Sequence, residues 1–383
     1  MTAPLDGVIV VALEQAVAAP LATRHLADLG ATVLKVERPG DGDFARHYDA
    51  KVNGSSTFFV WANRGKQSIT LDLKDDSDRA TFDALVAGAD VFIQNMSSNA
   101  AERAGVSAAQ LLEKHPALVA CDISGYGTGG PRTDDKAYDL AIQAEGGAMS
   151  LTGSADEMSK VGFSVADISS AMYAFSSILA ALYRRNVTGE GAAISLSMLE
   201  CLTEWTAVPV YAAAYSGTVP QRAGHRHALI APYGLYALSD GARVLVAVQS
   251  NRDWATFAEQ VLLDASLVSD PRFLENQDRI DNIAGVESAI AEAFGSVPPA
   301  EIIERLTSSG VVWARARDPQ QVWEHEQLAA RDRFMSVDLP TGPARVMKPP
   351  FNISDCPDPR SNVPELGEHD PALVEQLRNR TGR

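Results

Sequence analysis

Cysteine is scarce in this chain. Its 383 residues include three, Cys121, Cys201 and Cys356, which are far apart and form no CxxC pair. They cannot supply a disulfide framework or a zinc site by themselves, and a reducing cytoplasm fits this pattern. We expect each to be a small buried apolar side chain rather than a nucleophile.

Long apolar runs and excess positive charge are also missing. No run approaches the roughly 18 apolar residues of a membrane helix, and the first residues lack the basic and apolar regions of a secretory signal. The chain has 33 basic and 49 acidic residues, for a net charge of −16. Such a surface repels nucleic acid and anionic lipid, so we expect neither nucleic-acid nor membrane partners. An anionic ligand is still possible, because a few placed cations can form a local basic pocket.

Several catalytic motifs are absent as well. The dinucleotide fingerprint GxGxxG does not follow the first predicted strand, and no Walker A loop, GxSxG elbow or HExxH helix occurs. His225 and His227 are two residues apart, but without a third ligand in the pattern we interpret them as a solvated loop. The sequence therefore predicts no metal site.

The first 200 residues alternate between β and α patterns. Short β-branched runs, typical of strands buried on both faces, are separated by helical patterns; the predicted strands are 7–13, 32–37, 68–73, 90–95 and 118–124. Strands separated in this way favour a Rossmann-like doubly wound parallel sheet. The fold class predicted for the large domain is therefore α/β. The fold class alone does not imply that the protein binds NAD or ATP.

The regular alternation of predicted strands and helices ends at about residue 200. Segments 233–237 and 243–248 flank Ser239-Asp240-Gly241, which is a hairpin pattern, and helical segments follow. We predict a large domain over 1–200, a linker over 201–224, a smaller α+β domain over 225–325, and a return segment over 326–383 that completes the large domain. The return segment shows little strand pattern.

One carboxylate stands out. Asp167 lies where an apolar stretch turns into the apolar helix predicted over 168–185. The simpler interpretation is a helix N-cap. The other is a nucleophile that the helix dipole keeps ionised. Periodicity does not decide between them.

A series of short motifs runs nearly the length of the chain. Each is weak alone, but in this order and spacing the chain resembles the class III CoA-transferases. The motifs are Leu26-Ala27-Asp28-Leu29-Gly30-Ala31, Lys35-Val36-Glu37-Arg38-Pro39, Asn63-Arg64-Gly65-Lys66, Leu71-Asp72-Leu73-Lys74, Ser124-Gly125-Tyr126-Gly127, Lys136-Ala137-Tyr138-Asp139 with Gln143, Val165-Ala166-Asp167, Arg184-Arg185 with Thr188-Gly189-Glu190-Gly191, and Leu366-Gly367-Glu368-His369.

The resemblance implies that Asp167 is an acyl-carrying nucleophile. Its carboxylate would attack a donor thioester to form an aspartyl anhydride and then an aspartyl-CoA thioester. Gln15 matches a position where an amide holds an oxygen of the reacting groups. Tyr138 and Asp139 flank the same region and would shape the acyl site. No permanently bound cofactor is implied, since coenzyme A and acyl-CoA are substrates.

The resemblance also implies contacts with coenzyme A. Basic side chains suit its phosphates, arginine as a bidentate partner and lysine as a mobile point charge. The residues that match the family's CoA-binding positions are Arg38, Leu71, Lys74, Arg103 and Lys136.

Two departures bear on specificity. The racemase branch of the family has a histidine where this chain has Tyr138, which disfavours racemisation because that reaction needs two bases. The glycine-run flap of formyl-CoA transferase has no counterpart, so formyl-CoA/oxalate specificity is not implied. The opening Leu13-Glu14-Gln15-Ala16-Val17-Ala18-Ala19-Pro20, with Gly42-Asp43-Phe44-Ala45-Arg46, looks most like the members that act on mesaconate and itaconate. Cations that could pair with a second carboxylate are Arg46, Arg222, Arg226 and His227.

The leading hypothesis is therefore CoA transfer between short-chain dicarboxylic or branched acids, such as mesaconate, itaconate or succinate. Acyl-CoA racemisation and non-catalytic CoA binding are the alternatives, and a dehydrogenase is remote without the glycine fingerprint. The resemblance also implies an interlocked homodimer.

Overall fold

The computed structural model describes residues 2–380. The chain divides into two compact units, and each is taken by itself. The first consists of Met1–Ala148, Val161–Val210 and Gln327–Arg383, and the second of Met149–Lys160 and Tyr211–Glu326.

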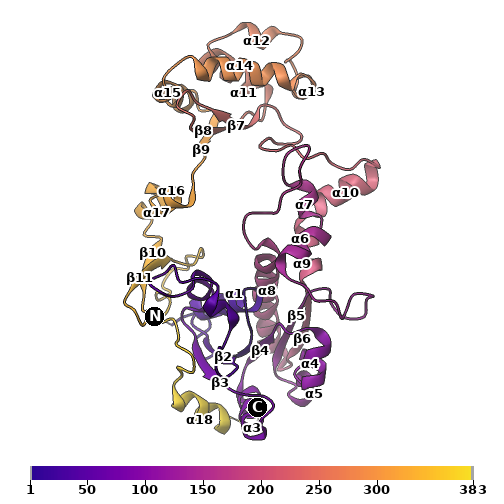
Figure 1. Cartoon of the computed structure of the whole chain (residues 1–383), viewed down its shortest axis with the longest axis vertical. Coiled ribbons are helices and arrows are strands. Elements are labelled where there is room, and N and C mark those ends of the chain that lie inside the picture. The colour runs from indigo at the N-terminus through magenta and orange to yellow at the C-terminus, as the bar shows by residue number, and fades with distance from the viewer. Residues whose placement is uncertain (1, 381–383) are drawn as a thin grey trace. The chain divides into compact units, whose positions relative to one another are not determined.

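A six-stranded parallel sheet forms the centre of the first unit (Figure 1). The strand order is β3-β2-β1-β4-β5-β6, which is the doubly wound order. The strands are β1 (Ile9–Leu13), β2 (Thr32–Glu37), β3 (Gln67–Thr70), β4 (Val91–Gln94), β5 (Val119–Ser124) and β6 (Ala192–Ser197). The predicted α/β sheet is confirmed.

Helices cover both faces of this sheet. The helices of this unit are α1 (Ala18–Asp28), α2 (Thr57–Asn63), α3 (Asp76–Gly88), α4 (Ser98–Ala104), α5 (Ala108–Lys114), α6 (Asp139–Glu145), α8 (Val165–Thr188) and α9 (Met198–Trp205), with the 3-10 turn η1 (Phe44–His47). Helices α7 (Ala148–Leu151) and α10 (Ala207–Ser216) belong to it only in part. Because side chains alternate along a strand, successive residues enter different cores. In β1, Val10 and Ala12 pack with α1 and α8, whereas Ile9 and Val11 pack with α3. The sheet is thus buried on both faces.

Helix α8 is long and apolar enough to cross a membrane by length and composition, and it is the one such helix among residues 2–380. Its inward side chains, including Ala171, Ala174 and Ile178, are buried in the core shared with α1. This packing is typical of the core helix of a globular protein.

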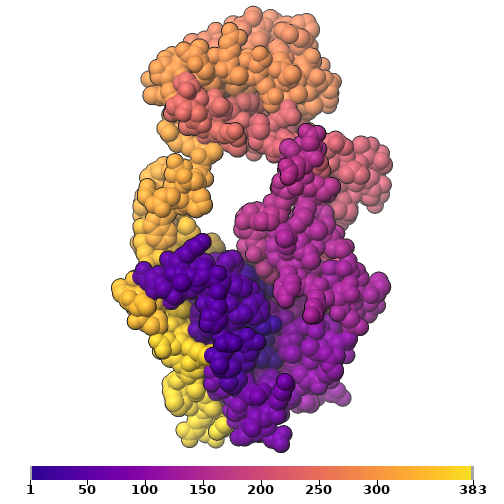
Figure 2. Space-filling view, in the orientation of Figure 1, coloured from indigo at the N-terminus to yellow at the C-terminus, as the bar shows by residue number. Residues whose placement is uncertain are grey.

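The end of the chain returns to the beginning. Helix α18 (Pro371–Asn379) places Leu373 and Leu377 in the same core as Phe82 of α3. The backbone of Gly65 donates to the carbonyl of Asn362 at 2.6 Å, and Ser68 donates to Glu368 at 2.8 Å. Figure 2 shows the yellow C-terminal segment lying against the indigo N-terminal part of this unit.

The second unit has a core of its own. Its three-stranded antiparallel sheet, order β7-β8-β9, packs against helices through buried side chains such as Trp254, Phe257 and Phe294. The elements are β7 (Tyr233–Ala237), β8 (Arg243–Ala247), α11 (Asn251–Thr256), the π-helical turn η2 (Phe257–Leu262), α12 (Ser266–Ser269), α13 (Asn276–Asp281), α14 (Ile283–Gly295), α15 (Pro299–Ser309), β9 (Val312–Arg315) and α16 (Pro319–Trp323). The predicted hairpin is confirmed by the antiparallel pairing of β7 with β8.

The prediction of little strand in the return segment was wrong. After α17 (Glu326–Ala330), strands β10 (Phe334–Val337) and β11 (Ala344–Met347) pair antiparallel. The strands are only four residues each, and Arg345 interrupts the apolar pattern. Its guanidinium lies 3.7 Å from the centre of the Phe334 ring, so the pair is held partly by a cation–π contact.

Candidate active site

Several of the residues predicted for the site follow strands of the parallel sheet at its carboxyl edge. The strand order reverses between β1 and β4, and ligands of such sheets bind outside the strand ends at this point. Gln15 follows β1 and Asn95 follows β4. The backbone N–H of Gln15 donates to Oδ1 of Asn95 at 3.0 Å, and Nδ2 of Asn95 donates to the carbonyl of Gln15 at 2.8 Å. The exposed side chain of Gln15 is thereby fixed at its base, at the reversal point.

Asp167 lies in the first turn of α8, but it does not cap that helix. The helix begins at Val165, and its free backbone donors are taken by another acid. Oδ1 of Asp139 accepts from the N–H groups of Ala166 at 2.8 Å and Asp167 at 3.3 Å. The N-cap interpretation of Asp167 was therefore wrong, and Asp139 supplies the cap. The Asp167 carboxylate has no hydrogen-bond or ion-pair partner within residues 2–380.

The electrostatic environment of Asp167 differs from the expected one. Burial, and then the charge of Asp139, raise the pKa of Asp167 to about 7. The expectation that the helix start keeps it fully ionised is thus wrong at neutral pH, since burial and the nearby acid outweigh the dipole. A carboxylate that is held unpaired, with a pKa near neutrality, is more basic and more reactive toward a carbonyl than an exposed one.

Asp139 is itself held in place. Its Oδ2 accepts from Nε2 of Gln143, one turn later on α6, at 2.8 Å. Gln143 is 1% exposed, and its Oε1 accepts from the backbone of Val161 at 2.8 Å. The amide therefore joins α6 to the segment that leads into α8, which fixes the start of α8 relative to Asp139.

Two tyrosines lie near this carboxylate. Burial, and then the charges of Asp43, Asp167 and Tyr138, raise the pKa of Tyr48 to about 12. These interactions bring the end of η1 and the start of α6 to the same place as the start of α8. Tyr138 is 72% exposed and directly precedes α6, so its ring is free to contact a ligand.

The predicted CoA-binding cations follow successive strands of the sheet. Arg38 comes directly after β2, Lys74 after β3, Arg103 on α4 after β4, and Lys136 after β5. All four are exposed. Arg38 donates through Nε to the carbonyl of Gly42 at 3.0 Å, whereas the charged groups of the other three have no partner within residues 2–380. Because parallel strands end at one edge, Arg38 and Lys74, which closely follow β2 and β3, lie at the same edge of the sheet as Gln15. Arg103 lies in the last turn of α4.

The structure gives three other predicted residues different surroundings. Leu71 is 6% exposed and packs in the α3-side core, which leaves little of its side chain for a ligand. Arg46 pairs with both carboxylate oxygens of Glu37, at 2.9 and 2.7 Å. His227 belongs to the second unit, where it is exposed and stacks on Tyr233.

Two of the three cysteines are buried as expected, whereas Cys356 is only partly buried. Cys121 and Cys201 are buried, and burial raises the pKa of both thiols, that of Cys201 to about 11. Neither is suited to act as a thiolate at neutral pH.

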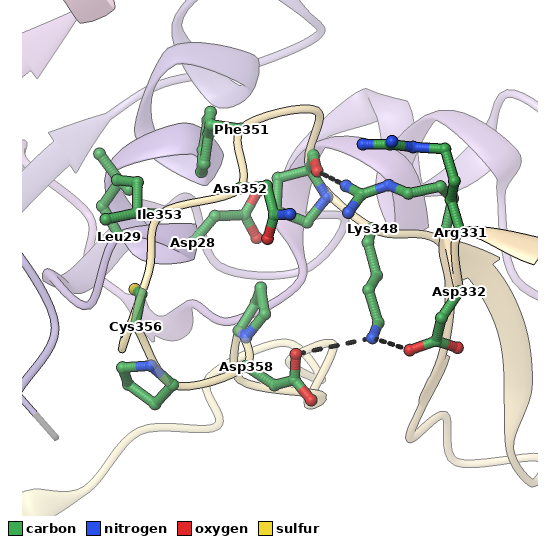
Figure 3. Close-up of a pocket in the computed structure, with 14 residues that line it drawn as sticks. Asp28, Leu29, Arg331, Asp332, Lys348, Phe351, Asn352, Ile353, Cys356 and Asp358 are labelled. Carbon is green, nitrogen blue, oxygen red and sulfur yellow. Dashed lines mark hydrogen bonds and ion pairs between the residues drawn. The ribbon is translucent and has the colours of Figure 1, made fainter.

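A pocket of about 160 Å³ lies between the end of α1 and the return segment (Figure 3). Lys348 crosses it and pairs with Asp332 at 2.7 Å and Asp358 at 3.6 Å. This volume is below the roughly 300–1,000 Å³ of typical small-molecule sites. None of the residues predicted for catalysis or CoA binding lines it.

Two residues near the site were not found by sequence reasoning. Tyr48 follows the 3-10 turn, and Asp43 caps that turn through Oδ1, which accepts from Ala45 at 2.9 Å. A clue was present in β2, where Lys35 and Glu37 occur in a strand that is buried on both faces. Buried charges require partners, so such a strand indicates acids and bases gathered around it.

A doubly wound sheet with cations after its strands, and an unpaired carboxylate at a helix start, defines an α/β protein suited to a phosphate-bearing ligand and to nucleophilic chemistry. Comparison with known proteins gives the family. The profile of CoA-transferase family III matches residues 5–370, and the chain belongs to that family.

Characterised relatives cover nearly the whole chain. An acetyl-CoA:oxalate CoA-transferase of Acetobacter aceti is 33% identical over 98% of this chain and 96% of its own. A succinyl-CoA:mesaconate CoA-transferase of Haloarcula hispanica is 30% identical over 99% of this chain and 97% of its own. Among solved structures, a CaiB/BaiF family protein from Brucella suis superposes with a TM-score of 0.86 at 33% identity, over 98% of this chain and 100% of its own.

These comparisons confirm the predicted family and the prediction of an enzyme. Members of the family are CoA-transferases, which use CoA thioesters as substrates. The non-catalytic alternative is thereby set aside.

The raised pKa of Asp167 predicts a pH-dependent stability difference. A carboxyl with a higher pKa folded than unfolded binds its proton more tightly when folded, so ionising it between about pH 4 and 7 lowers stability. Asp167→Asn removes this loss. We expect the variant to exceed wild type by about 1–2 kcal/mol in unfolding free energy at pH 8, a value reduced for partial exposure, and to match it near pH 4. Urea unfolding at both pH values measures the difference, and equal stabilities at pH 8 would contradict the environment assigned to Asp167.

Proposed function

We propose that the protein transfers coenzyme A from a CoA thioester to a short-chain dicarboxylic acid, with Asp167 as the acyl-carrying nucleophile. The observation that carries the proposal is the unpaired Asp167 carboxylate, whose helix-capping role is taken by Asp139. Burial and a like charge raise its pKa to about 7. The missing partner leaves the carboxylate free to attack a carbonyl, and the raised pKa makes its ionised form a stronger nucleophile.

The reaction balances without a redox group or a net proton. The Asp167 carboxylate attacks the donor thioester, the C–S bond breaks, and a mixed anhydride and CoA thiolate result. The thiolate attacks the aspartyl carbonyl, which releases the donor acid and leaves an aspartyl-CoA thioester. The acceptor carboxylate then attacks this thioester and forms a second anhydride. The thiolate finally attacks the acceptor's carbonyl, and the new thioester leaves with the Asp167 carboxylate restored.

Neighbouring groups have separate parts in this scheme. The Gln15 amide donates a hydrogen bond to an oxygen of the anhydride, where negative charge develops during attack. Tyr138 and Tyr48 line the acyl group. The phosphates of coenzyme A bind the basic side chains of Arg38, Lys74, Arg103 and Lys136. The small exposed part of the Leu71 side chain also contacts coenzyme A. No permanently bound cofactor takes part.

A dicarboxylic acceptor is supported by the relatives. Their names specify oxalate, mesaconate and, for an Agrobacterium fabrum protein 30% identical to this chain, glutarate. The second carboxylate needs a cation. The predicted candidates are Arg46, Arg222, Arg226 and His227; of these, Arg46 already pairs with Glu37 and Arg226 with Glu287. The three free cysteines also favour the reducing cytoplasm as the place of action.

The proposal includes a homodimer, interlocked as in the family. Helix α10 supports it, since nine of its ten residues are apolar and none is buried. Val208 is 79% exposed and Tyr215 is 91% exposed. A helix that is apolar on all sides is normally covered, and an exposed apolar patch marks an interface.

Trapping tests the covalent route. Wild type is mixed with succinyl-CoA, quenched with hydroxylamine, and its peptides are analysed by mass spectrometry. We expect a hydroxamate on Asp167 that forms faster as the pH rises through about 7, because only the carboxylate attacks. Asp167→Ala serves as the control and should remain unmodified. Failure of several acyl-CoA donors to modify Asp167 would refute the mechanism and favour racemisation, which deuterium exchange at the substrate α-carbon would reveal.

Light scattering tests the dimer. We expect a mass twice the 40.9 kDa of the chain at micromolar concentration. Val208→Glu should shift the mass toward the monomer, because it places a charge on the apolar helix. Gln376→Glu, on the exposed face of α18, adds the same charge without that effect. A monomeric wild type would contradict the proposal.

A further inference from the structure

Four charged residues are buried beneath the loop that follows β1. Lys35 and Lys66 are 0% exposed, Asp43 is 4% exposed, and Glu14 is 5% exposed. Nζ of Lys66 lies 2.6 Å from Oε1 of Glu14, and Nζ of Lys35 lies 2.8 Å from Oδ2 of Asp43. Lys35 also lies 3.5 Å from Glu14, so the two pairs form one network.

Stability alone does not account for this network. Each charge loses several kcal/mol of hydration on burial, and apolar residues of similar volume often replace buried ion pairs without loss. Burial lowers the pKa of Lys66 to about 7 even though Glu14 opposes the shift. A network that is costly to bury calls for a further role, and the backbone contacts of Asp43 indicate one.

Asp43 connects the network to two segments at the carboxyl edge. Its Oδ1 accepts from the backbone of Ala16 at 3.0 Å and from that of Ala45 at 2.9 Å. Its own N–H donates to Oε2 of Glu37 at 2.8 Å. One carboxylate oxygen therefore joins the loop after β1 to the 3-10 turn after β2.

The first of these segments carries Gln15. Ala16 has φ of 63°, a left-handed conformation that costs of order 1 kcal/mol for a residue with a side chain. The bond to Asp43 holds Ala16 in that conformation. Asn95 holds the preceding residue, Gln15, by hydrogen bonds to both its backbone N–H and its carbonyl. Without the Asp43 acceptor, the loop would relax and Gln15 would lose its fixed position.

The second segment carries Tyr48. Asp43 caps η1, and Tyr48 comes directly after that turn. Arg46, within the turn, is held by Glu37 and lies with its guanidinium 3.8 Å from the centre of the Phe59 ring. The turn is thus rigid, and its position relative to the loop after β1 depends on Asp43.

We propose that Asp43, itself oriented by Lys35, is a positioning residue that places Gln15 and Tyr48 around the Asp167 carboxylate and so sets the rate of acyl transfer to Asp167. This inference rests on the proposed function. Asp43 is buried and touches no substrate in this scheme. Its removal should therefore slow acyl loading without weakening the binding of coenzyme A.

The test compares two double variants that differ in one acceptor. Lys35→Met/Asp43→Ala removes the Oδ1 acceptor together with the cation that would otherwise be left unpaired. Lys35→Met/Asp43→Asn removes the same charges but keeps an oxygen for the N–H groups of Ala16 and Ala45. Loading of Asp167 by succinyl-CoA is followed by rapid quenching and mass spectrometry, and calorimetry gives the affinity for coenzyme A.

We expect the alanine double variant to load about 30-fold more slowly than wild type and the asparagine double variant to recover to within about threefold, since small misplacements near a reacting centre cost up to 10²-fold. Affinity for coenzyme A should stay within about twofold in both. Asp90→Ala is the matched control. Asp90 is also buried and accepts from a strand backbone, that of Ile9, but at the amino edge of the sheet, so its loss should lower stability and leave loading unchanged.

The possible outcomes distinguish the positioning role of Asp43 from the proposed function. Equal loading by the two folded double variants, or a parallel loss of CoA affinity, overturns the positioning role while the proposed function stands. No adduct on Asp167 in wild type overturns both. Should the alanine double variant fail to fold, Lys35→Met/Asp43→Leu replaces it, because leucine fills the space of the side chain but offers no acceptor to the N–H groups of Ala16 and Ala45. Loading by that variant as fast as by the asparagine double variant would also overturn the positioning role.

Discussion

The carboxylate of Asp139 caps helix α8, and the properties of Asp167 depend on that contact. Oδ1 of Asp139 takes the N–H groups of Ala166 and Asp167, which a residue near the helix start would otherwise satisfy itself. The Asp167 carboxylate is thereby left without a partner, and the second acid adds a like charge beside it. The cap thus leaves the proposed nucleophile free, while burial, and then the charge of Asp139, raise its pKa to about 7. Gln143 makes this arrangement rigid, since it holds Asp139 and the segment before α8 together.

The residues around Glu14 and Asp43 show a similar arrangement, in which some side chains fix the backbone and others stay exposed. Buried lysines neutralise Glu14 and Asp43, which in turn bind backbone or side-chain groups of nearby segments. Charged residues here fix the backbone, and residues such as Gln15 and Tyr48 are left exposed to a ligand. The parallel sheet provides the frame, because the ends of β1, β2 and β3 bring Gln15, Arg38 and Lys74 to one edge.

Much of this frame was predictable. Doubly buried strands such as β1 and β4 are short β-branched runs, and the helices between them have clear periodicity, so the parallel sheet followed from the sequence. Asp167 was singled out because a lone acid at the start of an apolar helix is conspicuous. The hairpin of β10 and β11 was missed because four-residue strands with an interrupted apolar pattern carry little periodicity.

The contacts that tune the site were not predictable from local pattern. Asp139 is 27 residues from Ala166, and Asp43 is 27 residues from Ala16, so both contacts exist only after the sheet has formed. Local reasoning left the N-cap interpretation of Asp167 open because it could not reveal the competing acid. The pKa of Asp167 likewise depends on burial and on Asp139, both of which are tertiary. Lys35 within β2 was the one local sign of a buried charge network.

Oxygen transfer tests the central claim most directly. In the proposed route, the acceptor carboxylate attacks an aspartyl-CoA thioester, and one acceptor oxygen stays on Asp167 when the product thioester leaves. Wild-type enzyme given succinyl-CoA and an ¹⁸O-labelled dicarboxylic acid should therefore gain one heavy oxygen on the peptide that contains Asp167, and on no other carboxylate. Transfer that proceeds at full rate while Asp167 stays unlabelled would contradict the account, because it would require direct exchange between the two substrates.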